Sequence, residues 1–230
     1  MGLRALIFDM DGLLLDTERL ALATWAEAGR SLGFDLDDET VRGTIGLDHV
    51  LTRAYYDRLF GDRFPFARVE EKHRELFRAH VRAHGVPVKP GAREILAEAH
   101  RLGLKVALGT SSRSLYAHAM LWLSNLAERF HVLSTRDGVK AGKPAPDIFL
   151  RATELLGCAP GECLVFEDSV NGIRAAVAAG IPVVMVPDLL PPTPELQACC
   201  VRICRSLNEA AECLPGWVEN GVSSSACSTT

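Results

Sequence analysis

Short, nearly continuous apolar runs recur along the chain and alternate with longer amphipathic stretches. Runs of this kind are typical of strands that are covered on both faces of a sheet. The clearest ones occupy residues 3–8, 105–108, 163–166 and 183–186. We therefore expect these segments to form the buried strands of one sheet.

Helical patterns lie between the later strands, at residues 92–102, 146–156 and 170–179. Gly103, Gly157 and Gly180 stand at or just after their ends, where glycine commonly terminates helices. Strands that alternate with helices form parallel sheets wound on both faces. The fold class predicted for this part is therefore α/β, with a doubly wound, Rossmann-like core.

Residues 16–87 break this alternation, because they contain no convincing strand. Helical patterns occupy residues 18–32, 48–60 and 66–84, and glycines separate them. The simplest arrangement is a helical cap domain, residues 16–87, inserted into a core domain made of residues 1–15 and 88–215. The Ser-rich C-terminal stretch, residues 218–230, is expected to be a disordered tail.

Polar side chains follow the predicted strands at their carboxyl ends. In a parallel sheet these ends meet at one edge, where active sites of such folds lie. The side chains are those of Asp9 and Asp11, Thr110 and Ser111, and Glu167 and Asp168, and Lys143 occupies a loop between the second and third groups.

Several carboxylates at close range repel one another. Two unit charges about 4 Å apart, at an effective dielectric of about 20, cost roughly 4 kcal/mol. A hard cation such as Mg²⁺ relieves this repulsion, and it commonly binds carboxylates together with phosphate oxygens. Hydroxyls, backbone N–H groups and a lysine are groups that hold phosphate. The pattern predicts a site for a phosphoryl group and Mg²⁺ together.

Composition narrows the class of protein further. The formal net charge of −4 offers no attraction to nucleic acid or an anionic membrane surface, and no apolar run is long enough to span a bilayer. The seven cysteines form no C-x-x-C pair and are expected to be free thiols. We therefore expect a soluble, cytoplasmic protein whose partner is a small molecule. A monomer is the default expectation, since the sequence does not show the oligomeric state.

Four sequence motifs resemble those of the haloacid dehalogenase superfamily. They are residues 9–18 (DMDGLLLDTE), Thr110 after an apolar run, residues 143–149 (KPAPDIF) and residues 166–173 (FEDSVNGI). Their order and spacing are similar to the branch with a helical cap after the first motif. Within it, the chain looks most like pseudouridine-5'-phosphatases and related sugar-phosphate phosphatases. The resemblance covers residues 1 to about 190.

The resemblance implies a Mg²⁺-dependent phosphatase that acts on a small phosphate monoester, such as a sugar phosphate or pseudouridine 5'-phosphate. Asp9 would be the nucleophile that forms an aspartyl-phosphate, and Asp11 the general acid and base. Thr110, Ser111 and Lys143 would bind the phosphate. The metal ligands would be Asp9, the Asp11 carbonyl, Asp168 and Glu167, the last directly or through a water.

Substrate choice in this branch is expected to rest with the cap. The loop at residues 42–49 resembles the segment that contacts substrate, with Asp48 and His49 as candidate contacts. Glu18, in the first cap helix, is a further candidate. Simpler structural explanations stay open for some site residues: Thr110 as an ordinary cap, and Lys143 as a surface lysine.

Other functions share parts of this pattern. A phosphoryl mutase of the β-phosphoglucomutase kind has the same core, but such members carry a histidine on the first cap helix, and residues 18–22 contain none. A dehalogenase does not need Asp11, and a phosphonatase would use a lysine on the first cap helix, which is absent. A receiver-like signalling module also forms an aspartyl-phosphate, but the helical insertion and Asp11 oppose it.

Overall fold

The computed structural model describes residues 2–47 and 49–222 and divides into two compact units. The core unit comprises Met1–Leu15 and Pro87–Thr230, and the cap unit comprises Asp16–Val86. The first boundary is the predicted one, and the second lies one residue before the predicted position. Each unit is described by itself below.

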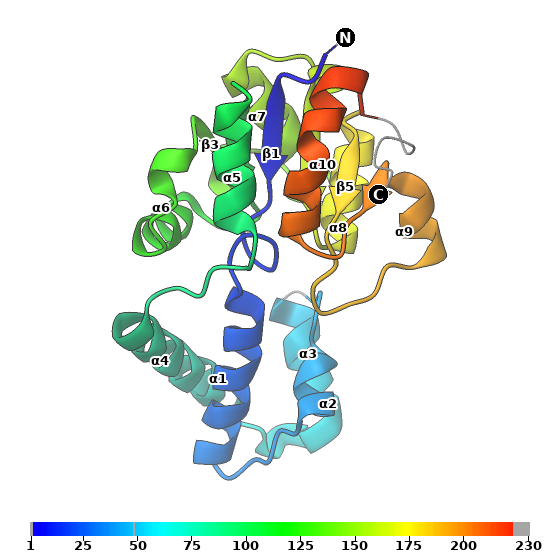
Figure 1. Cartoon of the computed structure of the whole chain (residues 1–230). Helices are drawn as coiled ribbons and strands as arrows, with labels where there is room; N and C mark the ends of the chain where they lie inside the picture. The colour runs from blue at the N-terminus through cyan, green and yellow to red at the C-terminus, as the bar shows by residue number, and fades with distance from the viewer. Residues whose placement is uncertain (1, 48, 223–230) are drawn as a thin grey trace. The chain divides into compact units, whose positions relative to one another are not determined.

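The core unit is built on one parallel six-stranded sheet (Figure 1). Its strand order is β3-β2-β1-β4-β5-β6, so the first strand of the chain lies near the centre. The strands are β1 (Ala5–Phe8), β2 (Lys105–Gly109), β3 (Val132–Ser134), β4 (Cys163–Glu167), β5 (Val183–Met185) and β6 (Arg202–Ile203). The α/β fold class is confirmed, and the edge strands β3 and β6 are additions to the prediction.

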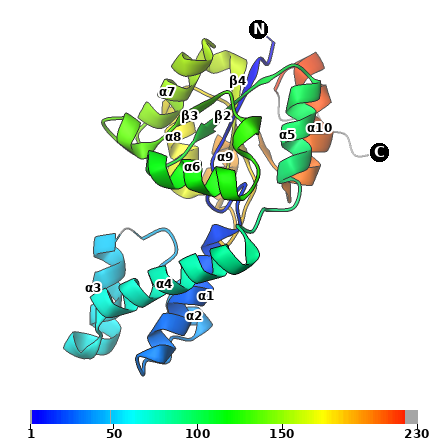
Figure 2. The ribbon, with the colours of Figure 1, turned by 90° about the vertical axis from the view of Figure 1, so that its left-hand side faces the viewer.

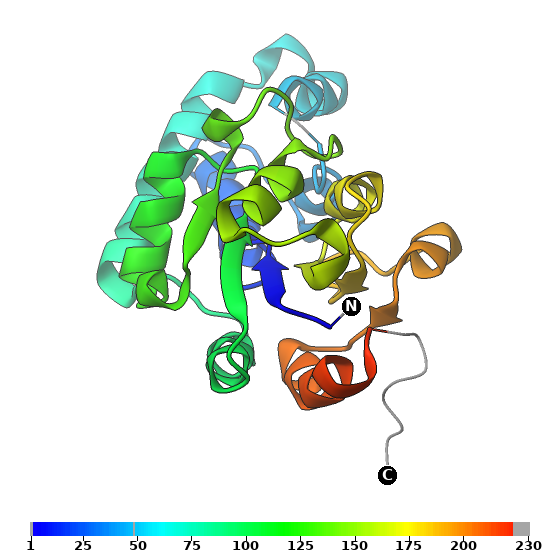
Figure 3. The same ribbon diagram turned by 90° about the horizontal axis from the view of Figure 1, so that it is seen from above.

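Helices cover both faces of this sheet. They are α5 (Ala92–Arg101), α6 (Ser114–Leu123), α7 (Asp147–Leu156), α8 (Val170–Ala178), α9 (Pro194–Cys199) and α10 (Leu207–Asn220). Seen from above in Figure 3, α5 and α10 lie on one face, and α7 and α8 lie on the other. Because α10 continues to Asn220, the prediction of disorder for residues 218–220 was wrong. Residues 223–230 of the predicted tail lie outside the described chain.

The helix α7 shows why the sequence folds in this way. Its residues Ile148, Phe149, Ala152 and Leu156 recur at intervals of one, three and four positions and are all buried. This spacing places them on one side of a helix, where they pack on the sheet with Ile7 of β1. The central strands are thereby enclosed in apolar side chains, and polar groups are left to the strand ends.

The cap unit is helical throughout its described part. Its α-helices are α1 (Thr17–Ser31), α2 (Asp38–Arg42), α3 (His49–Phe60) and α4 (Phe66–His84). In Figure 2, α4 crosses in front of α1, and these two helices pack together. The short helix α2 was not predicted. Asp37 begins it, because the Asp37 carboxylate accepts a hydrogen bond from the Thr40 N–H at 2.8 Å.

Aromatic rings fill the centre of the cap unit. The Tyr56 ring stacks on Phe64 with centroids 4.7 Å apart, and Trp25 lies 5.5 Å from Phe66. Tyr56 is completely buried. This cluster is a hydrophobic core separate from that of the sheet, so each unit has its own source of stability.

Two further observations concern the environment that was predicted for the chain. Within residues 2–47 and 49–222, no helix is long and apolar enough to cross a membrane. The cysteines of the described part are all free thiols, namely Cys158, Cys163, Cys199, Cys200, Cys204 and Cys213.

Candidate active site

The central strands of the core unit end at the same level. Phe8, the last residue of β1, pairs with Leu108 of β2 and with Phe166 of β4. The N–H of the next residue, Asp9, donates a hydrogen bond to the Phe166 carbonyl at 3.1 Å. The predicted convergence of polar groups at one sheet edge therefore follows from this register, with Asp9 held between two neighbouring strands.

Lys143 lies among the acids at this edge. Its ammonium group bonds to the Asp9 carboxylate and, at 2.6 Å, to Oε1 of Glu167. The nitrogen also lies 4.8 Å from the centre of the Phe149 ring. The Lys143 side chain is only 4% exposed, so the alternative of a surface lysine is excluded. A buried lysine needs charged partners, and here two carboxylates supply them. Lys143 is therefore part of a charged site.

Glu167 is buried completely, and its carboxylate has a full set of hydrogen-bond partners. While Oε1 accepts from Lys143, Oε2 accepts from the N–H groups of Asp168 and Ser169 and from the Ser169 hydroxyl, each at 2.9 Å. A β-carbon added at Gly172 would overlap this carboxylate. Glu167 therefore fixes Lys143 and the loop that follows β4.

Burial and nearby charge act against each other on Asp9. Burial raises its pKa to about 7, Lys143 opposes that rise, and the charge of Glu167 adds to it. Burial would lower the pKa of Lys143, but the two carboxylates outweigh this effect and raise it. The ammonium is therefore a permanent positive charge, and a second cation would stabilise the ionised form of Asp9 further.

The loop after β1 carries Asp11 and packs against a further acid, Asp168. Gly12 turns the chain with a φ of +88°, and its N–H donates to the Leu15 carbonyl at 2.9 Å. The Asp168 carboxylate packs against this turn so closely that a β-carbon at Gly12 would overlap it. Asp11, one residue before the turn, accepts a hydrogen bond from the Ser112 hydroxyl at 2.8 Å.

The turn after β2 supplies the predicted phosphate-binding groups. Thr110 is buried, and its hydroxyl oxygen accepts the Ser112 N–H at 3.0 Å, which keeps the turn tight. This bond lies within the turn and does not cap a helix, because α6 begins after Arg113 and has no side-chain cap. The Ser111 N–H has no acceptor within the described residues, so it is available to a ligand.

Comparison with known proteins shows the family of this chain. Residues 3–180 match the family model described as haloacid dehalogenase-like hydrolase. The chain belongs to the haloacid dehalogenase-like hydrolases. In the core of this hydrolase, the carboxylates of Asp9 and Glu167 and the ammonium of Lys143 meet at the carboxyl end of the sheet.

Among relatives, the hydrolase is 35% identical over 185 residues to a fructose-1-phosphate phosphatase of Escherichia coli, covering 79% of this chain and 95% of the relative. It is 33% identical to the phosphorylated carbohydrates phosphatase of Thermotoga maritima, covering 78% and 82% of the two chains. The crystal structure of CbbY from Rhodobacter sphaeroides, solved with phosphate, superposes with a TM-score of 0.71 at 27% identity, covering 90% of this chain and 96% of that one.

The acids of the hydrolase suit a hard cation. Asp9 and Asp168 are buried carboxylates on neighbouring strand ends, and Lys143 is a single positive charge beside several negative ones. Within the described residues, no three or more His, Cys, Asp or Glu side chains form a ready-made metal cage. Mg²⁺ does not need one, because it typically binds one or two carboxylates and completes its shell with water and substrate phosphate.

The cap candidates lie in the other unit. Glu18 is in the first turn of α1, and His49 begins α3, where its imidazole lies 3.2 Å from the Glu70 carboxylate. Asp48 lies outside the described residues. The roles of Glu18, Asp48 and His49 stay predictions.

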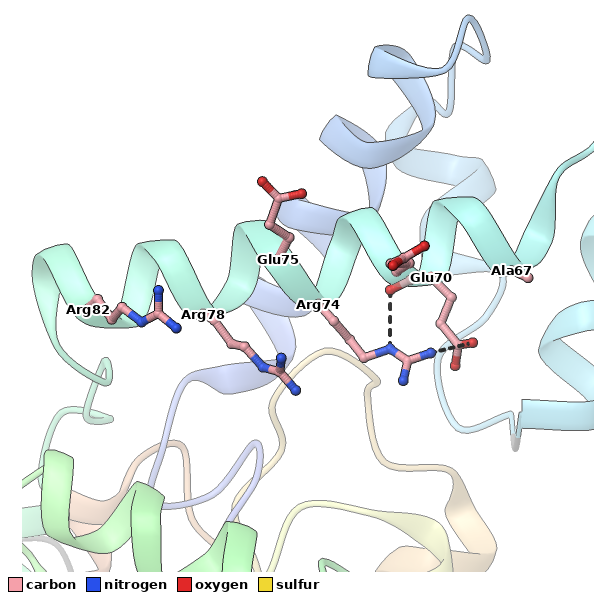
Figure 4. Close-up of a pocket in the computed structure, with 7 residues that line it drawn as sticks. Ala67, Glu70, Arg74, Glu75, Arg78 and Arg82 are labelled. Atoms are coloured by element: carbon pink, nitrogen blue, oxygen red, sulfur yellow. Dashed lines mark hydrogen bonds and ion pairs between the residues drawn. The ribbon is translucent and has the colours of Figure 1, made fainter.

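A pocket along α4 belongs to the same unit. Figure 4 shows Arg74, Arg78 and Arg82 in a row along the helix, on the side that also carries Glu70. Arg74 pairs with Glu70 at 2.7 Å, so Glu70 links this row to His49. The row was not predicted, because arginines at such spacing are also typical of a solvated helix face.

Two residues beside Asp11 were missed as well. Ser112 follows the candidate Ser111 in the sequence, but its contact with Asp11 at the carboxyl end of the sheet is visible only in the structure. Tyr116, in the first turn of α6, lies near the Asp11 carboxylate, and the helix that carries it was not predicted. The polar residues 110–114, which follow an apolar strand, were the feature of the sequence that could have pointed to these two residues.

Proposed function

We propose that this hydrolase is a Mg²⁺-dependent phosphatase that cleaves a small sugar phosphate through an aspartyl-phosphate on Asp9. The observation that carries the proposal is the bond between the Lys143 ammonium and the Asp9 carboxylate at the carboxyl edge of the sheet. A buried carboxylate with a cation beside it is suited to attack an anionic phosphate.

Asp9 acts first. One of its carboxylate oxygens attacks the phosphorus atom, and the bond from phosphorus to the ester oxygen breaks as the aspartyl-phosphate forms. Lys143 offsets the repulsion between the anionic nucleophile and the anionic phosphate. The hydroxyl of Thr110 and the N–H of Ser111 would bind phosphate oxygens as charge moves onto them.

Asp11 is the general acid and then the general base. It protonates the departing ester oxygen, and in the second step it takes a proton from the water that attacks the aspartyl-phosphate. Its carboxylate is held by Ser112, so it has a defined orientation before the substrate arrives. Hydrolysis of the intermediate releases inorganic phosphate and restores Asp9.

The residues that would hold Mg²⁺ are Asp9, Asp168 and the carbonyl of Asp11. Glu167 would act through a water, because both of its oxygens already accept hydrogen bonds. When bound, the ion supplies positive charge that lowers the repulsion between nucleophile and phosphate. The placement of Asp168 against Gly12 supports this assignment, since it brings that carboxylate to the loop of Asp9 and Asp11.

The proposed substrate is a phosphorylated sugar or a related small ester. The relatives from Escherichia coli and Thermotoga maritima are named for phosphorylated carbohydrates, and their coverage extends through most of this chain. Pseudouridine 5'-phosphate remains a candidate from the sequence motifs. Glu18, Asp48 and His49 of the cap are proposed to choose among such esters. A monomer in a reducing cytoplasm stays the prediction for its setting.

The test is release of inorganic phosphate from a panel of phosphate esters, with Mg²⁺ and with a chelator. Release that requires Mg²⁺ and peaks on one sugar phosphate supports the proposal. The variant Asp9→Asn should release none. Transfer of phosphate between positions of a sugar, without release, would instead indicate the mutase activity, and a stable aspartyl-phosphate with no turnover would indicate a signalling role.

A further inference from the structure

The chain enters the core unit from the cap unit through residues 87–91, the returning segment, which contacts the loop that carries Asp11. The Lys89 N–H donates a hydrogen bond to the Leu14 carbonyl at 2.9 Å. The residue before Lys89 pairs with Leu15 in an antiparallel bridge. Leu14 and Leu15 are completely buried, so the returning segment is built into the core beside the proposed acid.

The loop of residues 10–15 is closed by hydrogen bonds across its base. The N–H groups of Leu14 and Leu15 both donate to the Met10 carbonyl at 3.0 Å. The Gly12 N–H donates to the Leu15 carbonyl, and Asp11 forms a bridge with Leu15. The position of Asp11 therefore depends on Leu14 and Leu15, the two residues to which the returning segment is bonded.

Asp9 is held by other contacts. Its N–H donates to the Phe166 carbonyl of the neighbouring strand, and its carboxylate bonds to the Lys143 ammonium. A shift of the returning segment would therefore displace Asp11 more than it displaces the proposed nucleophile.

A buried ion pair attaches the returning segment to the edge of the sheet. The Lys89 ammonium bonds to the Asp188 carboxylate, and the two side chains are only 16% and 1% exposed. Val186, between β5 and Asp188, donates its N–H to the Glu167 carbonyl at 2.8 Å, which ties this stretch to the end of β4. Because charges in a poorly hydrated site interact strongly, the pair holds Lys89 close to the end of β5.

The far end of the returning segment is held by packing. Gly91 has a φ of +88°, and a β-carbon there would overlap backbone atoms of Leu207 and Asn208 at the start of α10. This contact fixes position 91. Two residues earlier, where the segment meets the loop of Asp11, the attachment is the ion pair between Lys89 and Asp188.

We propose that Lys89 and Asp188 form a positioning pair for the loop of residues 10–15, and that this pair sets the place of Asp11 for proton transfer. The proposal rests on the function proposed above for Asp11. Proton transfer depends strongly on the distance and angle between donor and acceptor, so a small displacement of the acid slows it. Neither residue belongs to the four motifs that carry the family resemblance.

The role predicts a dependence on the leaving group. An alkyl ester, such as a sugar phosphate, needs a proton on the departing oxygen, whereas p-nitrophenyl phosphate releases a stable anion without one. The ratio kcat/KM reports the steps up to formation of the aspartyl-phosphate, in which Asp11 acts as the acid. A displaced Asp11 should therefore lower kcat/KM for the alkyl ester, whereas general damage to the site would lower it for both esters.

The experiment removes the pair in two ways. Lys89→Met deletes the ammonium and keeps a side chain of similar length, but it leaves the Asp188 carboxylate buried without that ammonium. The double variant Lys89→Met/Asp188→Asn removes both charges. Each enzyme is assayed with Mg²⁺ on the sugar phosphate that the wild type prefers and on p-nitrophenyl phosphate.

We expect both variants to lower kcat/KM by roughly 10- to 100-fold for the sugar phosphate and by less than about threefold for the aryl ester. Thermal melting separates positioning from stability. The Tm should fall in Lys89→Met and recover in the double variant, which leaves no charge of this pair behind. The low rate on the sugar phosphate should persist in the double variant, because nothing then replaces the attachment.

Arg4→Met is the matched control. Arg4 pairs with Glu162 at 3.1 Å, also in the core unit, but these residues precede β1 and β4 and so lie at the opposite end of the sheet. Loss of this pair should leave kcat/KM for both esters unchanged.

Equal slowing of both esters, an unchanged rate on the sugar phosphate, or a double variant that recovers its rate together with its Tm would overturn the positioning role. Failure of the wild type and of Arg4→Met to hydrolyse either ester would instead overturn the proposed function itself.

Discussion

The charged groups of the core unit and those of the cap unit are arranged in opposite ways. In the core, Lys143 is almost fully buried between Asp9 and Glu167. In the cap, ion pairs such as Lys72 with Glu75, 3.1 Å apart, lie exposed along one helix. Charges in a poorly hydrated interior interact strongly and are costly to leave alone, whereas exposed pairs are screened by water. The same residue types are therefore buried and strongly coupled in one unit and exposed to water in the other.

The largest expected effect comes from the nucleophile. Asp9→Asn removes the attacking oxygen's charge and should abolish phosphate release, while a sugar phosphate still binds. Asp62→Asn, an exposed acid of the cap unit, is the control and should keep full activity. Normal turnover by Asp9→Asn, measured as released phosphate, would show that another group is the nucleophile.

Removal of the buried ammonium tests the contrast between the units directly. Lys143→Gln leaves the Asp9 and Glu167 carboxylates buried without their cation and should lower the free energy of unfolding by about 3–5 kcal/mol. The matched change Lys72→Gln, in the exposed pair, should cost less than about 1 kcal/mol. Urea unfolding of both variants measures the difference. Equal costs for the two lysines would contradict the comparison.

Gly172→Ala probes the packing of Glu167. A β-carbon there would overlap the Glu167 carboxylate, so the loop after β4 must shift. We expect a loss of about 1–3 kcal/mol in unfolding free energy, together with lower activity. Gly161→Ala is the control, since a β-carbon at Gly161 meets no atom within 4 Å. A fully stable and active Gly172→Ala enzyme would mean that Glu167 has no fixed position.

The smallest effect is expected in the cap. His49→Ala removes an exposed side chain that contacts Glu70 and the edge of the Phe66 ring, so stability should change by less than about 1 kcal/mol. If His49 contacts substrate as proposed, KM for the preferred ester should rise several-fold while kcat is unchanged. His84→Ala, exposed at the end of α4, is the control. Unchanged KM in both variants would remove His49 from the specificity residues.

The central part of the fold was predictable because its pattern is simple. The strands β1, β2, β4 and β5 are covered on both faces, so each is a nearly continuous apolar run, and each was placed within two residues. The edge strands β3 and β6 are short and only partly buried, and β6 includes Arg202, so they do not show this pattern. The helix α6 was also missed. It exposes Leu115 and Trp122, which hides the usual alternation of apolar and polar faces.

The acids, hydroxyls and lysine of the candidate site were predicted because each follows a recognisable strand or lies in a recognisable motif. Their contacts were not. Ser112 meets Asp11 only because the ends of β1 and β2 are neighbours in the sheet, and the start of α6 is bonded to Asp137, which lies beyond β3. The hydrogen bonds that the Glu167 carboxylate accepts could not be predicted from the sequence pattern either, because they depend on the turn at Ser169.

By itself, the sequence determined the four central strands, the acids at their ends and the helical stretch inserted after the first strand, since these properties depend on local periodicity and residue type. Only the tertiary structure decided that Lys143 reaches Asp9 across 134 positions, and that Glu167 supports it. The physical reason is that charge interactions act through space. Their strength is set by burial and distance, and both exist only once the strands have paired and the helices have closed over them.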